Sequence, residues 1–407
     1  MKVWLGVGLA ILAAATFAGS LDMRLRTPVP PPRELVSVPA PRPAPSVSLS
    51  FSWPGGLESA VALPGVTRNP IASHGGDRPI PVASLAKLMT AFLILRDHPL
   101  TLGVQGPTLT MTLADLQIYN QDVVEDQSSI QVKVGERLTE YQLLQALLVR
   151  SANNIASLLA QWDSGSVSRF VAKMNAAAKQ LGLPGTHFAD ASGFSNQTVS
   201  NASSIAKLAS IDMQNPVFRQ LVNEPSVNLP VIGELPNIVR RVGTGVVVGV
   251  KSGYTIWSGG CVAIALAVHT AFGHLETPVA VVLGVQGAAS LHRAANAASQ
   301  LASEVVGGVV RVGVVAKGEV IGSITVPWLK GGGKVRLVTA AALSTTAFSK
   351  QMIRFSYRPV KMRPTSIPRG TVAGYLLVST PTDTRRVEVV TSRTVAGPSL
   401  SWRVLDN

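Results

Sequence analysis

The chain has a single cysteine among its 407 residues, which excludes an internal disulfide. That residue, Cys261, lies in a run of small and apolar residues at positions 259–264, which favours a buried strand position over a nucleophile or a ligand. The six histidines form no cluster with metal-ligand spacing, so the sequence implies no metal and no other cofactor. Charged residues make up only 14% of the chain, below the roughly 25% of an average soluble domain.

An uninterrupted apolar run of 19 residues, positions 3–21, follows Lys2. At the extreme N-terminus such a run is typical of an exported protein. Thr16-Phe17-Ala18 fits the position before a cleavage site, yet the run is also about long enough to span a bilayer. Residues 1–21 are therefore predicted to be a signal peptide or an N-terminal membrane anchor, and both alternatives remain open. Either one places the protein outside the cytoplasmic membrane.

Eight prolines lie between Thr27 and Ser46. A segment this rich in proline favours extended polyproline II, so residues 22–47 are predicted to be a linker that acts as a spacer, without helix or sheet.

The first candidate site is Ser84-Leu85-Ala86-Lys87. A serine and a lysine three positions apart share one face of a helix, which puts the amine within reach of the hydroxyl. A lysine desolvated among apolar neighbours can take the proton of such a serine and activate it as a nucleophile. The following residues, 88–95, are almost all apolar, which predicts a buried helix. By itself the S-x-x-K pattern is weak, because it recurs by chance.

Two more motifs follow in order: Ser151-Ala152-Asn153, 67 residues after Ser84, and Lys251-Ser252-Gly253, another 100 residues on. S-x-x-K with S-D-N and K-T-G is the signature of serine penicillin-binding proteins and class A β-lactamases. The flanking sequences, above all residues 143–154 and 249–255, resemble the D-alanyl-D-alanine carboxypeptidase family of low-molecular-mass penicillin-binding proteins. The resemblance runs from about residue 48 to about residue 304. No glutamate in a convincing deacylation motif lies between Ser151 and Lys251, which disfavours a β-lactamase.

The resemblance implies an α+β fold: a transpeptidase-like catalytic domain over residues 48–304, with an antiparallel sheet flanked by helices and a helical lobe. Periodicity adds candidate helices at 84–96, 140–162, 167–181, 203–212 and 290–305, and strands at 246–250 and 260–269. From residue 305 to residue 407, short strands between glycines predict a small all-β domain.

The resemblance also implies roles for the motif residues. Ser84 would be the nucleophile that forms an acyl-enzyme with peptidoglycan stem peptides, Lys87 its base, and Ser151 a proton carrier to the leaving D-alanine. Asn153 would hold either the substrate or the Lys87 amine. Lys251 and Ser252 would bind the terminal carboxylate of the substrate, and the N–H groups of Ser84 and Tyr254 would form the oxyanion hole. β-Lactams would be covalent inhibitors.

The C-terminal region carries most of the charge. Residues 305–407 hold 15 Lys and Arg against 4 Asp and Glu, a balance of +11 out of +14 for the chain. This region is either a solvated surface or one that binds anionic membrane or wall polymers; nucleic acid is not expected. The leading function is a D,D-carboxypeptidase. A D,D-endopeptidase that cuts crosslinks and a non-catalytic cell-wall-binding protein remain as alternatives.

Overall fold

The computed structural model describes the backbone of residues 2–405 except at positions 68, 240, 244, 274, 330–332, 364–365 and 382–383, and side chains from residue 13 onwards. These residues form two compact units. Residues 47–309 form the motif unit, which contains all three sequence motifs. Residues 1–46 and 310–407 form the β unit. Each unit has its own hydrophobic core.

A five-stranded antiparallel sheet organises the motif unit. Its strand order is β11 (Val247–Thr255), β12 (Gly259–Leu266), β15 (Val279–Val285), β3 (Glu58–Ala62) and β4 (Ala72–His74). Every residue of β12 and β3 is buried, as expected for strands covered on both faces. β11 lies at an edge, so one side of the strand that carries the K-S-G motif is free of a neighbouring strand.

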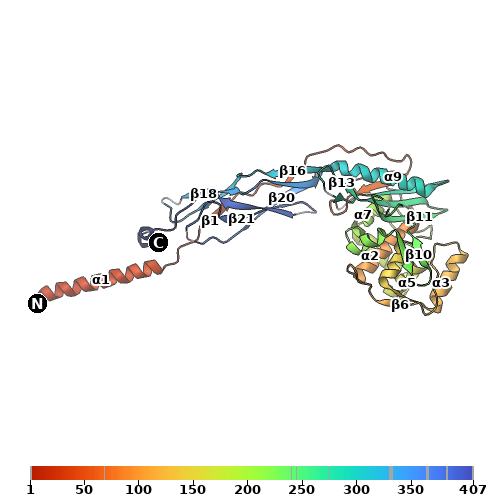
Figure 1. Ribbon diagram of the computed structural model, residues 1–407, viewed down its shortest axis with the longest axis horizontal. Helices are drawn as coiled ribbons and strands as arrows, with labels where there is room; N and C mark the ends of the chain where they lie inside the picture. The colour runs from red at the N-terminus through yellow and green to blue at the C-terminus, as the bar shows by residue number, and fades with distance from the viewer. Residues whose placement is uncertain are drawn as a thin grey trace. The chain divides into compact units, whose positions relative to one another are not determined.

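Helices cover both faces of this sheet (Figure 1). α9 (Ser290–Val305) packs on one face, and α7 (Ala202–Asp212) packs on the other. The remaining helices of the unit are η1 (Ala83–Ala86), α2 (Lys87–Asp97), α3 (Leu113–Val124), α4 (Glu140–Leu148), α5 (Asn153–Ser164), α6 (Val167–Leu181), α8 (Pro216–Val222) and η2 (Val306–Gly308). α2 lies in the core, with most of its side chains fully buried, as its apolar sequence predicts.

Short strand pairs complete the motif unit: β5 (Ile80–Pro81) with β8 (Val199–Ser200), β6 (Thr108–Thr110) with β7 (Arg137–Thr139), β9 (Ser226–Leu229) with β10 (Gly233–Pro236), and β13 (Val268–His269) with β14 (Leu275–Glu276). The α+β class, with an antiparallel sheet flanked by helices, agrees with the fold that the resemblance implies.

One predicted helix is wrong as a single element. The sequence favoured a continuous helix over residues 140–162, but the structure breaks it between α4 and α5. Ser151 has a positive φ of 63°, and Ala152 is extended, so the chain leaves the helical path within the S-A-N motif. The N–H of Asn153 then bonds to the carbonyl of Ser128, 2.7 Å away, instead of to a preceding helical turn. Helical periodicity continues through this break and therefore hides it.

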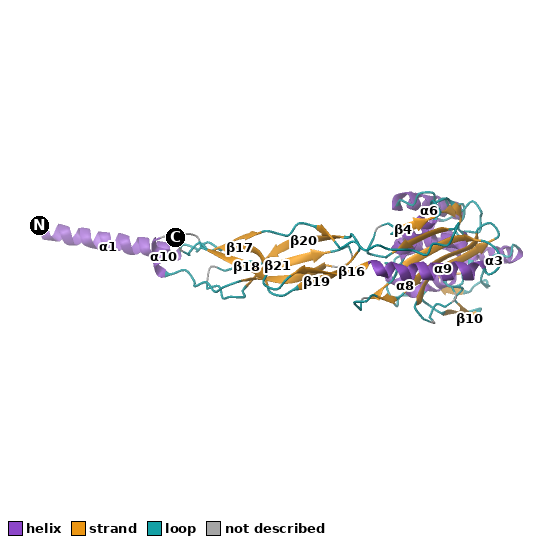
Figure 2. Cartoon of the chain, turned by 90° about the horizontal axis from the view of Figure 1, so that it is seen from above, coloured by secondary structure: helices purple, strands orange, loops and turns teal. Residues whose placement is uncertain are grey.

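The β unit consists mainly of strands (Figure 2). Its seven-stranded antiparallel sheet has the order β1 (Arg33–Val36), β17 (Val320–Thr325), β18 (Lys334–Thr339), β22 (Thr384–Thr391), β21 (Val372–Ser379), β20 (Met352–Pro359) and β2 (Arg42–Pro43). β16 (Val309–Val315) pairs with β19 (Leu343–Phe348), and the chain ends with α10 (Leu400–Leu405).

The proline-rich segment is part of this unit. The prediction of a spacer without sheet structure is wrong for two short stretches, because residues 33–36 pair with β17 and residues 42–43 pair with β20. Both strands lie at the edges of the sheet, where proline is tolerated, since one side of an edge strand needs no N–H donor. Residues 33–36 themselves contain no proline.

The N-terminal segment forms α1 (Lys2–Arg26). The predicted signal peptide or anchor, residues 1–21, falls largely on residues 1–12, whose side chains lie outside the described part of the structure. Within the described part, no helix has both the length and the apolar character needed to cross a membrane.

Candidate active site

Ser84 and Lys87 meet where η1 passes into α2. Ser84 lies in the 3₁₀ turn, and Lys87 is the first residue of the α-helix. The Nζ of Lys87 lies 3.0 Å from the Oγ of Ser84, which is hydrogen-bonding distance. Lys87 is fully buried, whereas Ser84 is half-buried, so the hydroxyl is open to a substrate while the amine is shielded from water.

The Lys87 amine has two further oxygen partners. It donates to Oδ1 of Asn153 at 2.6 Å and to the backbone carbonyl of Ser192 at 2.8 Å. Burial lowers the pKa of Lys87 from its ordinary value near 10.5 to about 7, against the opposing effect of the Asp190 and Asp122 carboxylates. Close to neutral pH, much of this amine is therefore unprotonated and can accept a proton.

The amide of Asn153 is held from its other end. Its Nδ2 donates to Oε1 of Gln127 at 2.6 Å, and the amide of Gln127 donates to Oε2 of Glu125, also at 2.6 Å. These contacts fix the orientation that turns the oxygen of Asn153 toward Lys87. Sequence reasoning placed Asn153 at the site but did not find Gln127, which belongs to no motif.

The sequence also did not predict the Ser192 carbonyl as a partner of Lys87, because every residue has a backbone carbonyl and its contacts do not restrict the residue type. It is presented by a turn built around Asp190, whose carboxylate accepts from Ser192 Oγ at 2.7 Å and from the N–H of Phe194 at 2.8 Å. Gly193 has a φ of 83°, and a Cβ there would lie 1.8 Å from the Ala83 carbonyl oxygen. The glycine thus lets this turn approach η1 beside Ser84, and it was the one available signal in the sequence.

Ser151 projects from the break between α4 and α5. It is 1% exposed, and its Oγ is among the buried side-chain atoms without a hydrogen-bond partner within the described residues. A buried hydroxyl without a partner loses solvation without compensation, and it therefore stands ready for a proton donor or acceptor. The positive φ of Ser151 directs the residue out of the helical path that its neighbours follow.

The K-S-G strand passes directly beside Ser84. A Cβ at Gly253 would lie 2.5 Å from the backbone nitrogen of Ser84, so only glycine permits this approach. Because side chains alternate along a strand, Lys251 shares the Gly253 side of β11, while Ser252 and Tyr254 take the opposite one. The side chain of Tyr254 is 55% exposed.

Lys251 is fully buried and donates to the Ser252 carbonyl at 3.2 Å. Burial lowers the pKa of Lys251 well below its ordinary value, and the positive charges of Lys87 and Arg150 act in the same direction. Since Gly253 lies against the backbone of Ser84, the first and third motifs meet in one site.

Among the residues that the structure describes, no group of three or more His, Cys, Asp and Glu could hold a metal ion. Cys261 is buried within β12, and burial raises the pKa of its thiol to about 11, which leaves it protonated and unreactive at neutral pH.

The sequence profile of D-alanyl-D-alanine carboxypeptidases matches residues 58–286, more than half of the chain and the whole of this site. The chain belongs to the D-alanyl-D-alanine carboxypeptidase family. The family predicted from the three motifs is thereby confirmed.

Curated relatives include both kinds of peptidase named above. The chain is 28% identical over 226 residues to a D-alanyl-D-alanine endopeptidase of Escherichia coli, covering 51% of this chain and 69% of the relative. It is 29% identical to the endopeptidase of Pseudomonas aeruginosa, covering 41% and 51%. It is 34% identical to a D-alanyl-D-alanine carboxypeptidase of Streptomyces sp. strain K15, covering 34% and 48%. The chain thus spans only about half the length of most of these relatives.

Solved structures show the same fold. Penicillin binding protein 5 from Haemophilus influenzae superposes with a TM-score of 0.57 at 17% identity, covering 86% of this chain and all of that one. A peptidoglycan synthesis regulatory factor, PBP3, from Streptococcus pneumoniae gives a TM-score of 0.57 at 18% identity, with the same coverage. These likenesses confirm the predicted penicillin-binding fold class.

Proposed function

We propose that the protein is a serine D-alanyl-D-alanine carboxypeptidase that removes the terminal D-alanine from peptidoglycan stem pentapeptides. In this reaction Ser84 Oγ attacks the carbonyl carbon of the penultimate D-alanine while its proton passes to the neutral Lys87 amine. The C–N bond then breaks, D-alanine leaves with a proton, and the acyl chain stays on Ser84. Water hydrolyses this ester and regenerates the hydroxyl.

The observation that carries the proposal is the environment of Lys87. Its amine is fully buried, lies 3.0 Å from Ser84 Oγ, and has a pKa lowered to about 7 by burial. A general base is most effective when its pKa lies near the working pH, since it is then neutral often enough to accept a proton and basic enough to hold it. A lysine with a purely structural role would not require a lowered pKa and a hydrogen bond to a partly exposed serine.

The other motif residues take complementary roles in this proposal. The hydroxyl of Ser151 carries the proton to the leaving amine, and Asn153 holds the Lys87 amine in place. Lys251 and Ser252, from the two sides of β11, bind the terminal carboxylate of the substrate at the free edge of this strand. Burial lowers the pKa of Lys251, and a substrate carboxylate beside the amine favours its charged form. The N–H groups of Ser84 and Tyr254 stabilise the oxyanion, and the approach of Gly253 to Ser84 supports this pairing.

A D,D-endopeptidase that uses the same residues is the second candidate, favoured by relatives that bear this name. Both candidates place the protein where peptidoglycan is found: at the outer face of the cytoplasmic membrane, in the periplasm or in the cell wall. We assign the basic residues 305–407 to attraction for anionic membrane or wall surfaces.

Penicillin provides the direct test, because a β-lactam acylates an activated serine of this kind. Incubation should increase the intact mass of the protein by the mass of one drug molecule, and peptide mapping should place it on Ser84. A stem pentapeptide should lose one D-alanine in the same preparation, and Ser84→Ala should do neither. Protein that remains unmodified at saturating drug, or label on another serine, would contradict the assignment.

A further inference from the structure

The turn between β11 and β12, residues 256–258, exposes two large apolar side chains. Ile256 is 73% exposed and Trp257 is 61% exposed. Apolar residues that are scattered singly over a surface are ordinary, whereas neighbouring ones form a contiguous patch, and such patches mark binding sites. Tryptophan is the side chain that most often contributes strongly to such sites, because its ring offers a large apolar surface.

Hydrogen bonds within the turn hold it in one conformation. The N–H of Thr255 donates to Oγ of Ser258 at 3.0 Å, and the N–H of Ser258 donates to Oγ1 of Thr255, also at 3.0 Å. Ser258 is buried, and its hydroxyl donates to the carbonyl of Gly259 at 2.8 Å. Ile256 and Trp257 are therefore held in the solvent by an ordered turn. A ligand that binds to an ordered surface loses less conformational entropy than one that has to order a mobile loop.

The turn continues the strand that borders the nucleophile. β11 packs against η1, and Gly253 lies against the backbone of Ser84. Trp257 follows Tyr254 by three residues, so their Cα atoms are at most about 11 Å apart. The apolar patch of Ile256 and Trp257 therefore lies within reach of a peptide that is bound at Ser84.

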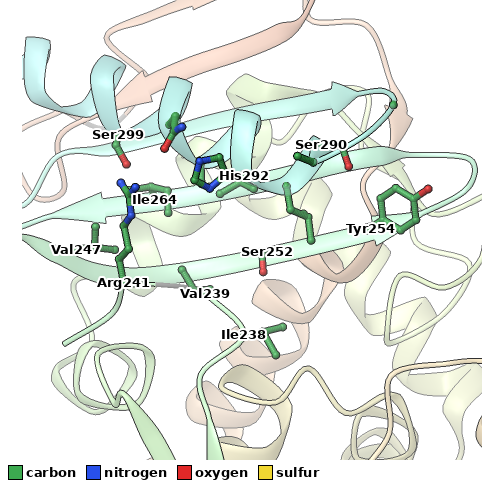
Figure 3. A pocket seen from close by; sticks show the side chains of 16 residues that line it. Ile238, Val239, Arg241, Val247, Ser252, Tyr254, Ile264, Ser290, His292 and Ser299 are labelled. Carbon is green, nitrogen blue, oxygen red and sulfur yellow. The ribbon is translucent and has the colours of Figure 1, made fainter. Parts of the chain in front are cut away.

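The ring of Tyr254 does not extend this patch. It lies on the α9 side of β11, where Tyr254 and Ser252 line a cavity of about 580 Å³ (Figure 3). Ile256 and Trp257 are not among the described residues that line this cavity. The two side chains of the turn thus form a separate surface beyond the end of β11.

The proposed reaction determines which part of the substrate meets the turn. The leaving D-alanine binds through its carboxylate at Lys251 and Ser252, and the oxygen of the scissile carbonyl accepts from the N–H of Tyr254. A substrate with both contacts runs antiparallel to β11 along the free edge of this strand, and its acyl part continues toward residues 255–257. An extended peptide advances about 3.3 Å per residue, so the residue that precedes D-Ala-D-Ala comes beside the turn.

We infer that Ile256 and Trp257 form a subsite for the residue that precedes D-Ala-D-Ala in the substrate, and that this subsite selects a long aliphatic side chain. The inference rests on the proposed function and adds two specificity-determining residues to it. An aliphatic chain that lies along the indole ring is removed from water on one side, so each of its methylene groups contributes to binding. A methyl side chain is too short to gain this contact.

Two N-acetylated tripeptides test the subsite: L-norleucyl-D-Ala-D-Ala and L-alanyl-D-Ala-D-Ala, which differ only by three methylene groups. Release of D-alanine gives kcat/KM for each peptide, and the ratio of the two values measures the preference. The variants are Trp257→Ala, Trp257→Phe and Ile256→Ala. Phe272→Ala is the matched control, because it removes an exposed aromatic ring from the turn between β13 and β14, past the other end of β12.

The wild type should prefer the norleucine peptide about tenfold, since each added methylene group in an apolar site favours the larger substrate. Trp257→Ala should reduce this ratio to about twofold by lowering kcat/KM for the norleucine peptide, because the ring that covers the aliphatic chain is absent. Trp257→Phe keeps an aromatic surface and should retain most of the preference. Ile256→Ala removes a smaller surface and should reduce the ratio by about half. Phe272→Ala should match the wild type on both peptides.

Other outcomes overturn the inference in distinguishable ways. If the wild type hydrolyses both peptides with the same kcat/KM, the subsite assignment is wrong and the carboxypeptidase stands. If Trp257→Ala lowers kcat/KM for both peptides by the same factor, or for neither, Trp257 does not select this side chain. The same conclusion follows if Phe272→Ala reduces the preference as much as Trp257→Ala does. A protein that is not acylated by penicillin and releases D-alanine from neither peptide would contradict the proposed function, and the subsite with it.

Discussion

In the proposed reaction Lys87 has to be neutral before it can accept the proton of Ser84, and its pKa of about 7 makes this condition depend on pH. The neutral fraction grows as pH rises through the pKa, so the rate of acylation by penicillin should rise with pH and reach half its maximum near pH 7. Stopped-flow or quenched-flow acylation rates between pH 5 and pH 9 would check this. A flat profile would mean that Lys87 is not the base.

A substitution at Asp122 should shift the pH dependence of acylation. Its carboxylate raises the pKa of Lys87, and its own pKa is raised to about 6, mainly by burial. Asp122→Asn removes the negative charge, so the pKa of Lys87 should fall and the midpoint should move to lower pH by about half a unit. Asp126→Asn, the same change at an exposed carboxylate that is not among the charges acting on Lys87, is the control and should leave the midpoint unchanged. A shift to higher pH would contradict the argument.

The effect of replacing Lys251 on kcat/KM should depend on whether the substrate ends in a charged carboxylate. Its amine is buried, which lowers its pKa, and a substrate carboxylate beside it favours the charged form. Lys251→Ala should therefore reduce kcat/KM for a peptide ending in D-Ala-D-Ala carboxylate about 10²-fold or more, in line with losing a hydrogen bond to a charged group, and should affect the C-terminal amide less. An equal loss of kcat/KM for the carboxylate and the amide peptide would contradict a carboxylate-binding role for Lys251.

The residues in the motifs could be predicted from the sequence because their chemistry restricts residue type. Ser84 and Lys87 are spaced for one helix face, and the structure brings them to 3.0 Å. The Ser192 carbonyl and the support of Asn153 by Gln127 could not be predicted. A carbonyl exists at every position, and which one points at Lys87 depends on the path of a turn more than 100 residues away. The roles of the motif residues stay predictions until they are measured.

Among the elements, the sequence predicted those with strong periodicity. α6 and α9 have the bounds expected from their apolar stripes, Val167–Leu181 and Ser290–Val305. Prediction from the sequence failed for elements whose ends are set by tertiary contacts and not by the local residue pattern. The break at Ser151 depends on the bond from Asn153 to the distant Ser128 carbonyl, and β1 exists because β17 offers it a partner. Neither partner can be inferred from nearby residues.

The turn of residues 190–194 should be sensitive to a single methyl group. Gly193→Ala places a Cβ 1.8 Å from the Ala83 carbonyl oxygen, so the turn or η1 has to move. Gly56→Ala has a similarly positive φ but open space around it, and it reports the cost of the backbone conformation alone. Gly193→Ala should lower the free energy of unfolding by about 1–3 kcal/mol more than Gly56→Ala, as overpacking does. Denaturant unfolding would measure both.

Loss of contact between this turn and η1 should also show in function. Displacing Ser192 removes one of the oxygen partners of the Lys87 amine, so Gly193→Ala should slow penicillin acylation while Gly56→Ala should not. If the Gly193→Ala protein has wild-type stability and a wild-type rate of acylation, the close packing of the turn against η1 affects neither stability nor the Lys87 amine, which would contradict this prediction.

In the whole molecule, chemistry and net charge lie in different units. All seven predicted site residues belong to residues 47–309, whereas residues 305–407 hold +11 of the net charge of +14. Within the β unit, Arg358, Lys361 and Arg369 are exposed, and no acidic residue lies between positions 350 and 370. Such a cluster attracts an anionic surface by about 1 kcal/mol for each charge near it. The sequence shows the charge imbalance. A binding experiment has to decide whether these residues attract an anionic surface or are only a solvated surface.

Sedimentation with anionic vesicles tests this at two salt concentrations. Protein lacking residues 1–22 should bind at low salt and dissociate as salt rises, because exposed charges are screened over about 10 Å at 0.1 M ionic strength. Reversal of Arg358, Lys361 and Arg369 to Glu should weaken binding and leave pentapeptide hydrolysis unchanged. The matched control reverses three exposed cations of the motif unit, Lys133, Arg169 and Lys179, for the same change in net charge. If both triple variants lose binding equally, net charge alone is responsible and the β unit has no special role. If only the first does, its basic surface holds the peptidase against the surface on which its substrate lies.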